Sequence, residues 1–179
     1  MARHVAFLRG INVSGRRVGR DDLRSCFEEL GFGEVATFRA SGNVIFDADR
    51  ERLADMAARI EAGLAKSLGY EVPVYLRTGA EVRAIADLQP FAPELVEASA
   101  GKLQVALLLA SPTTKLREQV LALATDQDRL AIEGRELYWL PSGGIMDSTL
   151  STGAMEAALG ALTMRTKNTI EQLAAKYLP

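Results

Sequence analysis

The sequence contains very few of the side chains that enzymes most often use for nucleophilic or metal chemistry. Its 179 residues include one cysteine and one histidine. One cysteine excludes an internal disulfide and any zinc or iron–sulfur site built from several thiolates. A Ser-His-Asp or Cys-His centre would have to use His4, and no serine stands in a G-x-S-x-G context. The sequence therefore indicates no metal site and no cofactor.

The single cysteine, Cys26, lies on an expected helix together with Leu23, Phe27 and Leu30. That spacing is typical of the buried face of a helix. A nucleophilic cysteine would need a positively charged and partly exposed setting. We therefore interpret Cys26 as a buried structural thiol.

Long apolar runs and an excess of one charge are also missing. No apolar run reaches the roughly 18 residues of a membrane span, and the four apolar residues before Arg9 are too few for a signal peptide. We therefore expect a cytoplasmic protein without a membrane partner. The 21 basic and 23 acidic side chains leave a net charge of −2, which argues against nucleic-acid binding through bulk charge. These features carry no information about oligomeric state.

Hydrophobic periodicity predicts a regular order of elements in the first half of the chain. Strand-like and helix-like segments follow one another as β-α-β-β-α-β, which is the ferredoxin-like arrangement. Asp49 is placed to cap the second helix, and Gly69 to end it. The expected segments are residues 5–8, 21–30, 35–40, 44–47, 49–68 and 72–77.

The second half repeats this element order without recognisable repetition of the residues themselves. Its strands are expected at 103–109, 129–132, 137–140 and 162–165, with helices near 111–123, 151–159 and 168–177. Two pairs, Thr78 with Glu81 and Asn168 with Glu171, have the spacing of capping boxes. We infer an α+β fold of two ferredoxin-like halves, residues 1–79 and 102–179, joined by a helix and linker over residues 80–101.

Glycines and arginines concentrate around the end of the first strand. Residues 5–20 contain four arginines, three glycines and no acid. A right-handed β-α-β crossover makes the first and second strands run the same way, so this segment and the turn at 41–43 should share one edge. The free N–H groups that begin the first helix should lie there too. This edge is a candidate site for an anion.

Each residue type at this edge has a chemical reason and a structural alternative. Glycine lets a ligand approach the backbone, and arginine pairs with phosphate or carboxylate oxygens. Alternatively, the glycines serve only the turn and the arginines are simply solvated. The segment matches neither the Walker A nor the G-x-G-x-x-G pattern. The candidate ligand-binding residues are Arg9, Gly10, Asn12, Gly15, Arg16, Arg17, Ser41 and Asn43, with Arg20 beside them and Arg165 and Asn168 as second-half candidates.

Four segments of the chain form a distinctive set: Leu-Arg-Gly-Ile-Asn-Val-Ser-Gly at 8–15, Leu-Gly-Phe at 30–32, Ser-Gly-Asn-Val-Ile-Phe at 41–46 and Thr-Met-Arg-Thr-Lys-Asn-Thr-Ile at 163–170. Together they resemble the bacterial domain-of-unknown-function 1697 family over nearly the whole length. The resemblance implies two ferredoxin-like halves and no established activity. It also implies ligand-contact roles for the matching residues Arg9, Asn12, Ser41, Asn43, Arg165 and Asn168.

The chain departs from the pattern of that family at two places. Residues 165–169 read Arg-Thr-Lys-Asn-Thr where the family has Arg-Asn-Trp-Asn-Thr. Residues 148–150 read Ser-Thr-Leu where the family has Ser-Lys-Leu. A mechanism that needs that tryptophan or that lysine is therefore not expected here.

These observations leave three functions open. The first is binding of a small anionic ligand, phosphate-bearing or nucleotide-like, at the arginine-bearing edge. The second is binding of single-stranded RNA, because RNA-recognition modules share the element order. Nucleic acid is the less favoured partner, because the interleaved aromatic residues of an RNP signature are absent: the first strand offers only Phe7 and the third only Phe46. The third is a protein-interaction scaffold without a ligand, and no residue pattern specifies whether the protein is an enzyme.

Overall fold

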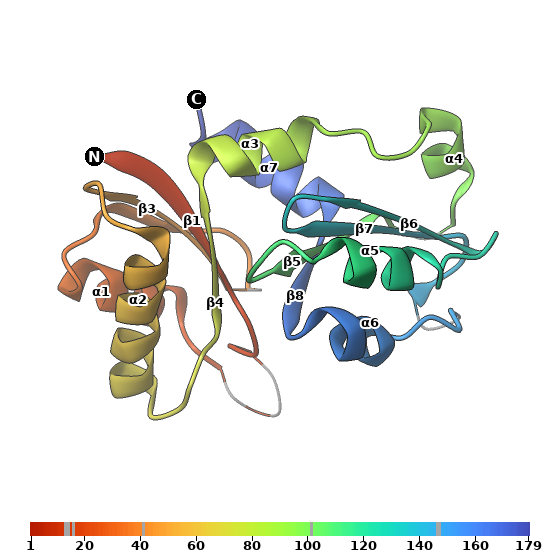
Figure 1. Ribbon diagram of the computed structural model, residues 1–179. Coiled ribbons are helices and arrows are strands. Elements are labelled where there is room, and N and C mark those ends of the chain that lie inside the picture. The colour runs from red at the N-terminus through yellow and green to blue at the C-terminus, as the bar shows by residue number, and fades with distance from the viewer. Residues whose placement is uncertain (13–14, 16, 41, 101, 146–147) are drawn as a thin grey trace. The chain divides into compact units, whose positions relative to one another are not determined.

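The computed structural model describes residues 1–12, 15, 17–40, 42–100, 102–145 and 148–179 (Figure 1). None of the helices within these ranges is long and apolar enough to cross a membrane. The predicted succession β-α-β-β-α-β is present in each half. The elements are β1 (Ala2–Leu8), α1 (Arg20–Glu29), β2 (Gly33–Thr37), β3 (Asn43–Ala48), α2 (Leu53–Leu68), β4 (Val74–Thr78), α3 (Gly79–Asp87), α4 (Pro93–Ala98), β5 (Gln104–Leu108), α5 (Thr114–Leu121), β6 (Asp128–Glu133), β7 (Glu136–Pro141), α6 (Thr152–Leu159), β8 (Leu162–Thr166) and α7 (Lys167–Tyr177).

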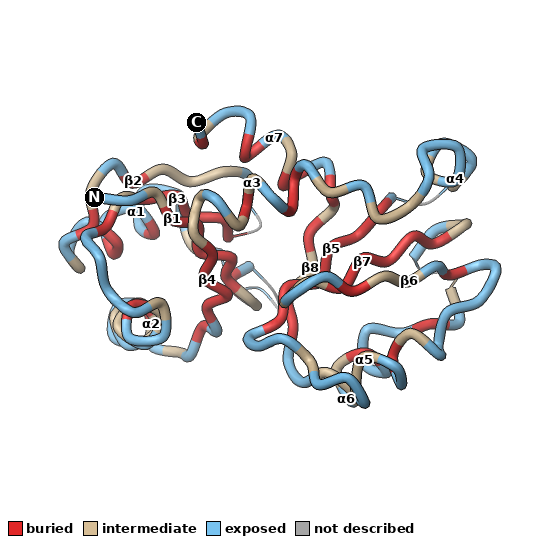
Figure 2. The backbone as a smooth tube through the Cα atoms, turned by 45° about the horizontal axis from the view of Figure 1, so that its top comes forward, coloured by how far each residue is buried: buried red, intermediate tan, exposed pale blue. Residues whose placement is uncertain are grey.

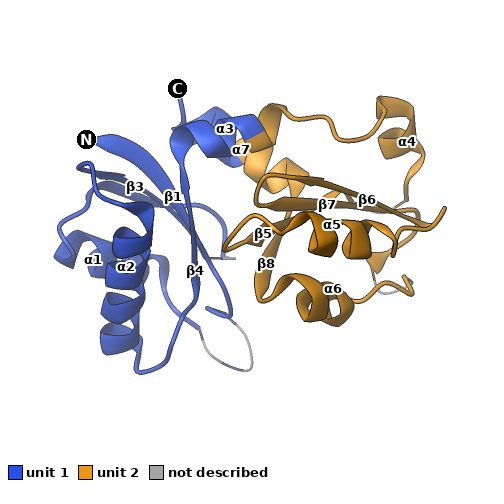
Figure 3. Cartoon of the chain, viewed as in Figure 1, with its two compact units in different colours: residues 1–84, 173–179 blue, residues 85–172 orange. Residues whose placement is uncertain are grey.

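The chain divides into two compact units (Figure 3). The first unit contains Met1–Ala84 and also Leu173–Pro179, and the second contains Ile85–Gln172. The last residues of the chain therefore group with the first unit, whereas the sequence analysis assigned them to the second half. The stretch expected to be a linker also contains a helix, α4, with Pro93 in its first turn, where proline is well tolerated.

Each unit contains one four-stranded sheet in which the hydrogen-bonded neighbours are antiparallel. The strand order is β2-β3-β1-β4 in the first unit and β6-β7-β5-β8 in the second. Both orders place the first strand of the unit in the interior of the sheet, beside the third and fourth strands. This is the ferredoxin-like arrangement, and the predicted fold class is confirmed.

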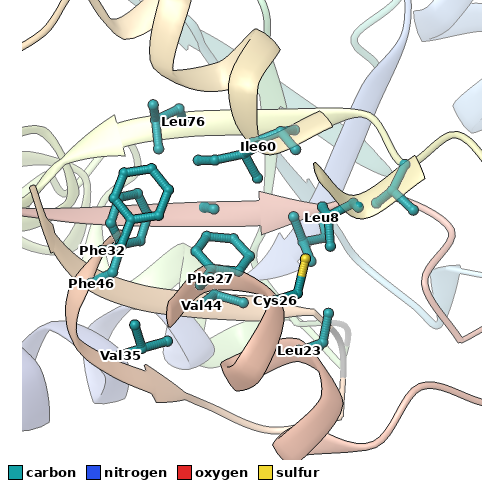
Figure 4. Close-up of a cluster of buried hydrophobic side chains, with 14 of the residues drawn as sticks. Leu8, Leu23, Cys26, Phe27, Phe32, Val35, Val44, Phe46, Ile60 and Leu76 are labelled. Atoms are coloured by element: carbon teal, nitrogen blue, oxygen red, sulfur yellow. The ribbon is translucent and has the colours of Figure 1, made fainter. Parts of the chain in front are cut away.

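The core of the first unit is a cluster of apolar side chains between one face of its sheet and helices α1 and α2 (Figure 4). Three aromatic rings pack at its centre: Phe46 lies 4.4 Å from Phe32 and 5.3 Å from Phe27, measured between ring centroids. Ile60 of α2 is fully buried in the same cluster, and Cys26 of α1 is buried beside them. Burial of each such aromatic or aliphatic side chain stabilises the fold by about 1.5–3 kcal/mol.

The second unit has a core of the same design. Trp139 and Leu137 of β7 pack with Val120 of α5 and Met155 of α6. Figure 2 shows the inner strands of both units buried along most of their length and the outward faces of the helices exposed. Helices α1 and α2 therefore form an amphipathic layer on one side of the first sheet, and α5 and α6 form one in the second unit, as the 3.6-residue periodicity predicts.

Two of the predicted N-terminal helix caps are wrong and one is confirmed, and Gly69 ends α2 as predicted, with a φ of +79°. The Thr78–Glu81 capping box is present, with Glu81 N–H donating to Thr78 Oγ1 and Thr78 N–H donating to Glu81 Oε2. Helix α2 begins later than expected, with its N-cap at Arg52 rather than Asp49. Helix α7 begins at Lys167 directly after β8, so its first turn is closed by Thr166, whose Oγ1 accepts from Thr169 N–H at 3.2 Å.

The two sheets also repeat residues that sequence inspection alone had not matched. Val5 lies opposite Arg77 in the first sheet, and Val105 lies opposite Arg165 in the second. The tripeptides Leu76-Arg77-Thr78 and Met164-Arg165-Thr166 therefore end the last strand of each unit in the same register. Both arginines are buried, and each donates from Nη1 to the carbonyl oxygen of the residue before it. The register of the strands reveals a repetition that is too short to detect by itself.

Candidate functional site

The end of β1 lies against the corner between β2 and β3, as the crossover argument predicts. The N–H of Leu8 donates to the carbonyl oxygen of Gly42 at 2.8 Å. On the other side of the strand, the N–H of Arg9 donates to the carbonyl oxygen of Pro73 at 3.0 Å. One edge of the first sheet therefore gathers the end of β1 and the segments that lead into β3 and β4.

Asn12 fastens the loop after β1 to this corner. Its side-chain Nδ2 donates to the carbonyl oxygen of Ala40 at 2.5 Å, and its Oδ1 accepts from the N–H of Val18 at 2.9 Å. Since the asparagine is exposed, these bonds are made at the surface rather than in the core. A single side chain thus joins the start of the loop, the end of the loop and the hairpin.

Gly42 is placed where only glycine fits. Its φ of +74° belongs to the left-handed region, which L-residues with a side chain adopt at a cost. A Cβ there would lie 2.7 Å from Ile11 Cγ2 and 3.0 Å from Leu8 Cβ. Ile11 is itself buried in the core of the unit, so it has little room to move. The close contact of loop and corner therefore depends on this glycine.

The remaining glycines and the asparagine of the predicted set have conformational or packing roles. Gly10 and Gly15 have φ angles of +70° and +80°. Asn43 is buried at 1% exposure, and its Nδ2 donates to the carbonyl oxygen of Phe38 at 2.8 Å. Asn43 thus closes the turn from inside. A direct contact with a ligand is therefore less suited to Asn43 than to the exposed Asn12.

Four arginines of the described residues belong to these segments. Arg9 is half-buried, and Arg17, Arg20 and Arg39 are exposed. Arg39 was not among the predicted residues; it has a φ of +59° and holds its guanidinium 5.4 Å from the centroid of the Phe38 ring. The position of Arg39, two residues before the Ser-Gly-Asn turn, is the sequence feature that could have identified it. Two further candidates, Arg16 and Ser41, lie outside the described residues.

We call this surface the arginine rim and define it by the loop residues Arg9, Gly10, Asn12, Gly15, Arg17 and Arg20 and the hairpin residues Arg39, Ala40 and Gly42.

The N-terminus of α1 adjoins the rim, and acidic side chains there reduce the positive electrostatic effect of the helix dipole. Asp21 and Asp22 occupy the first turn, and Asp22 Oδ2 accepts from the N–H of Gly19 at 3.2 Å. The carboxylates already complement the dipole there, so an anion would meet the guanidinium groups rather than the helix end.

The two second-half candidates belong to the second unit. Arg165 is 8% exposed, and its Nη1 donates to Thr163 Oγ1 at 3.0 Å and to Met164 O at 2.8 Å. Burial lowers the pKa of the Arg165 guanidinium from its ordinary value to about 10. The equivalent position of the first unit also carries a buried arginine, Arg77, which favours a structural role shared by both. Asn168 is exposed on α7, where its Oδ1 accepts from Gln172 Nε2.

The described residues offer little nucleophilic or metal chemistry. They contain no group of three or more histidine, cysteine or acidic side chains placed to hold a metal ion. Burial raises the pKa of the Cys26 thiol, and the nearby Glu29 carboxylate raises it further. A thiol with a raised pKa is a poor nucleophile at neutral pH, in agreement with a structural role.

The fold and the rim together define a class of protein: an α+β protein of two ferredoxin-like units whose first unit carries an arginine-bearing edge. A family model described as protein of unknown function, DUF1697, matches residues 1–138 of the chain. The chain therefore belongs to the DUF1697 family.

A solved structure supports the same fold over the whole chain. It is described as the structure of conserved bacterial protein SP0830 from Streptococcus pneumoniae. The two are 17% identical, and the match covers 98% of this chain and 99% of the other with a TM-score of 0.73. At this identity the likeness concerns the fold alone. No curated protein matches the chain in sequence.

Proposed function

We propose that the arginine rim binds a small anionic ligand, either phosphate-bearing or nucleotide-like. The observation that carries the proposal is the Asn12 clamp, which holds an arginine-bearing loop against a hairpin that bears Arg39. The clamp fixes the backbone while Arg17, Arg20 and Arg39 extend from it as exposed side chains. A fixed backbone with several guanidinium groups lowers the conformational cost of binding phosphate oxygens.

The positive charge of the arginine rim is local, because the chain as a whole carries no net positive charge. The net charge is −2, so the chain has no general affinity for anions. Four guanidinium groups within the rim therefore give it a local positive potential. Because Arg17, Arg20 and Arg39 are exposed, salt should weaken their pairing with a ligand strongly.

The rim supports binding more than it supports a reaction. The acidic residues beside it, Asp21 and Asp22, complement the first turn of α1. The only histidine, His4, is buried near the opposite end of β1. No described side chain of the rim is thus suited to move a proton at neutral pH.

The two alternatives receive less support. Phe7 and Phe46, the aromatic residues that a single-strand binder would use for base stacking, are both fully buried. A scaffold that only binds proteins would have no need for a loop held in this way by Asn12. Nucleic-acid binding is therefore an outcome of the test below rather than a further proposal.

The test compares two double variants with equal loss of charge. Arg17→Gln with Arg20→Gln removes two exposed guanidinium groups of the rim. Arg50→Gln with Arg52→Gln removes two exposed arginines after the far end of β3. Calorimetric titration and thermal shift with inorganic phosphate, AMP, ATP and glucose 6-phosphate give the affinities.

The rim double variant should weaken binding of at least one of these anions about tenfold or more, with the second pair unchanged. The affinity should also fall as NaCl is raised. Absence of any binding at millimolar concentrations, or equal weakening by both double variants, would reject the proposal. Retention of single-stranded oligonucleotide that depends on Arg17 and Arg20, without binding of the small anions, would favour the nucleic-acid alternative.

A further inference from the structure

The second unit contains a polar cavity at the open end of the β6–β7 hairpin. Its volume is about 450 Å³, which is enough for a small metabolite. The lining comes from the segment before β6, the end of β7 and the loop that leads to α6. The described lining residues are Thr125, Gln127, Asp128, Pro141, Ser142, Gly143, Gly144, Ser148 and Thr149. None of these residues is among the candidates predicted from the sequence.

One buried carboxylate organises this cavity. Asp128 is 1% exposed, and its Oδ1 accepts from Trp139 Nε1 and from Ser148 Oγ, each at 2.7 Å. Ser148 Oγ in turn accepts from the N–H of Leu150 at 2.9 Å. The carboxylate is thus locked in place by donors from β7 and from the loop before α6.

Both of these side-chain donors bond Oδ1 of Asp128, and neither bonds the other carboxylate oxygen, Oδ2. Among the described residues, Asp128 Oδ2 has no hydrogen-bond donor, although Asp128 lines the cavity. A carboxylate oxygen that no protein donor occupies can accept a hydrogen bond from a molecule in the cavity. A ligand that donates a hydrogen bond to Oδ2, and above all one that carries a positive charge, would pair with it.

The rest of the lining favours a cation over an anion. The described lining residues include no lysine or arginine, and their other polar groups are hydroxyls, one amide and the backbone at two glycines. Ser142 Oγ donates to Gln127 Oε1, so that amide is already oriented. Asp126, the neighbouring acid, lines adjoining depressions rather than this one. Among the described lining residues, the one charged group is therefore the Asp128 carboxylate, with neutral hydrogen-bonding groups around it; the adjoining depressions carry Arg129 as well as Asp126.

We propose that this cavity is a second binding site, for a small hydroxylated amine whose ammonium group pairs with Asp128 Oδ2. The hydroxyls of Ser142 and Thr149 would bind the neutral polar part of the same molecule. An ammonium ligand fits better than a metal ion, because Asp128 is the only acidic side chain among the described lining residues and divalent ions favour several oxygen ligands.

The molecule carries its own reporter for this site. Trp139 is the only tryptophan in the chain, and its indole N–H is bonded to the proposed carboxylate. In a ¹⁵N-labelled sample the indole N–H therefore gives a single resonance beside the cavity. The probes are matched pairs, glucosamine with glucose and 4-aminobutanol with 1,4-butanediol, at a pH where the amines are protonated.

We expect at least one of the amines to shift the indole resonance in a saturable way, with its neutral partner at least about tenfold weaker. Asp128→Asn keeps an oxygen for Trp139 and Ser148 but places an amide where Oδ2 was, so it should abolish that preference. Asp126→Asn removes the same charge from the adjoining surface and should leave the shift unchanged.

A second variant tests the same site without changing Asp128, in case the Asp128→Asn protein does not fold. Thr149 is exposed at the edge of the cavity, so Thr149→Phe should block entry while the indole resonance keeps its native position. The proposal is rejected if no amine shifts the resonance, if the neutral partners shift it equally, or if Thr149→Phe leaves binding unchanged. These outcomes are independent of the arginine rim, whose residues lie in the first unit.

Discussion

Asn12 and Ala40 are joined by a hydrogen bond of 2.5 Å from the side-chain Nδ2 to the backbone oxygen, although 28 positions separate them in the chain. The bond lies where the loop after β1 meets the β2–β3 hairpin. Because the N–H of Leu8 also donates to the carbonyl oxygen of Gly42, the two segments are held by side chain and by backbone together. The arginine rim is therefore part of the folded framework of the first unit.

Replacing Asn12 should destabilise this framework measurably. Asn12→Ala removes the donor to Ala40 O and the acceptor of the Val18 N–H, and each such bond contributes about 0.5–1.5 kcal/mol net. We expect a loss of about 1–2 kcal/mol in the free energy of unfolding, measured by urea denaturation. Asn168→Ala, at another exposed asparagine, should change it by less than about 0.5 kcal/mol. Equal effects of the two substitutions would contradict the clamp.

Gly42 and Gly15 form a second matched pair. Their φ angles are +74° and +80°, but a Cβ at Gly42 would lie 2.7 Å from Ile11 Cγ2, whereas a Cβ at Gly15 would meet nothing within 4 Å. Gly15→Ala should therefore cost only the backbone strain, about 1 kcal/mol. Gly42→Ala should cost that strain and the overlap, in total about 3 kcal/mol. Thermal unfolding of both variants provides the measurement, and a Gly42→Ala cost no larger than that of Gly15→Ala would be inconsistent with the packing.

Cys26 should resist thiol reagents in the folded protein. Burial raises the pKa of its thiol, and Glu29 adds to the shift, so the folded state holds the proton more tightly than the unfolded state. The resulting contribution to stability is present below the pKa of the unfolded thiol and is lost as the pH rises through the raised pKa of the folded thiol. Reaction with a disulfide reagent should be at least about tenfold slower than in urea. A rate equal to that of the unfolded chain would show an accessible thiol.

The start of α7 tests a cap that the sequence analysis misplaced. Thr166 Oγ1 accepts from the N–H of Thr169 and also bonds its hydroxyl. Thr166→Ala should reduce the free energy of unfolding by about 1 kcal/mol, the usual value for an N-cap. Thr166→Ser, which keeps the acceptor oxygen, should restore most of the loss. If instead Asn168→Ala were the damaging substitution, the capping box predicted from sequence would be correct.

Much of the fold was predictable because it depends on local patterns. Alternation and helical period gave the element order, and the crossover rule correctly placed the end of β1 beside the β2–β3 corner. The α7 cap was missed because β8 passes directly into the helix. Two possible caps, Thr166 and Asn168, then stand two positions apart, and only the register of β8 on β5 selects between them. Local sequence cannot supply that register.

The cavity of the second unit was not predictable for a different reason. Asp128, Trp139 and Ser148 come from three separate segments and meet only after the hairpin and the following loop have packed. Arg39 was missed because an arginine with positive φ contradicts its ordinary backbone preference. In both places tertiary contacts decide the outcome, and those contacts leave no periodic signal in the sequence.

The two compact units are not consecutive in the chain, and this decides how they can be expressed separately. Residues 85–172 interrupt the first unit, whose chain resumes at Leu173. The guanidinium of Arg83 donates from Nη2 to the carbonyl oxygens of Leu178 and Pro179, so the final residues complete the N-terminal module. A single cut in the chain therefore cannot yield both units with all of their residues. A fragment that ends at Ala84 would lack residues 173–179 of the first unit, whereas replacing residues 85–172 by a short linker would keep them.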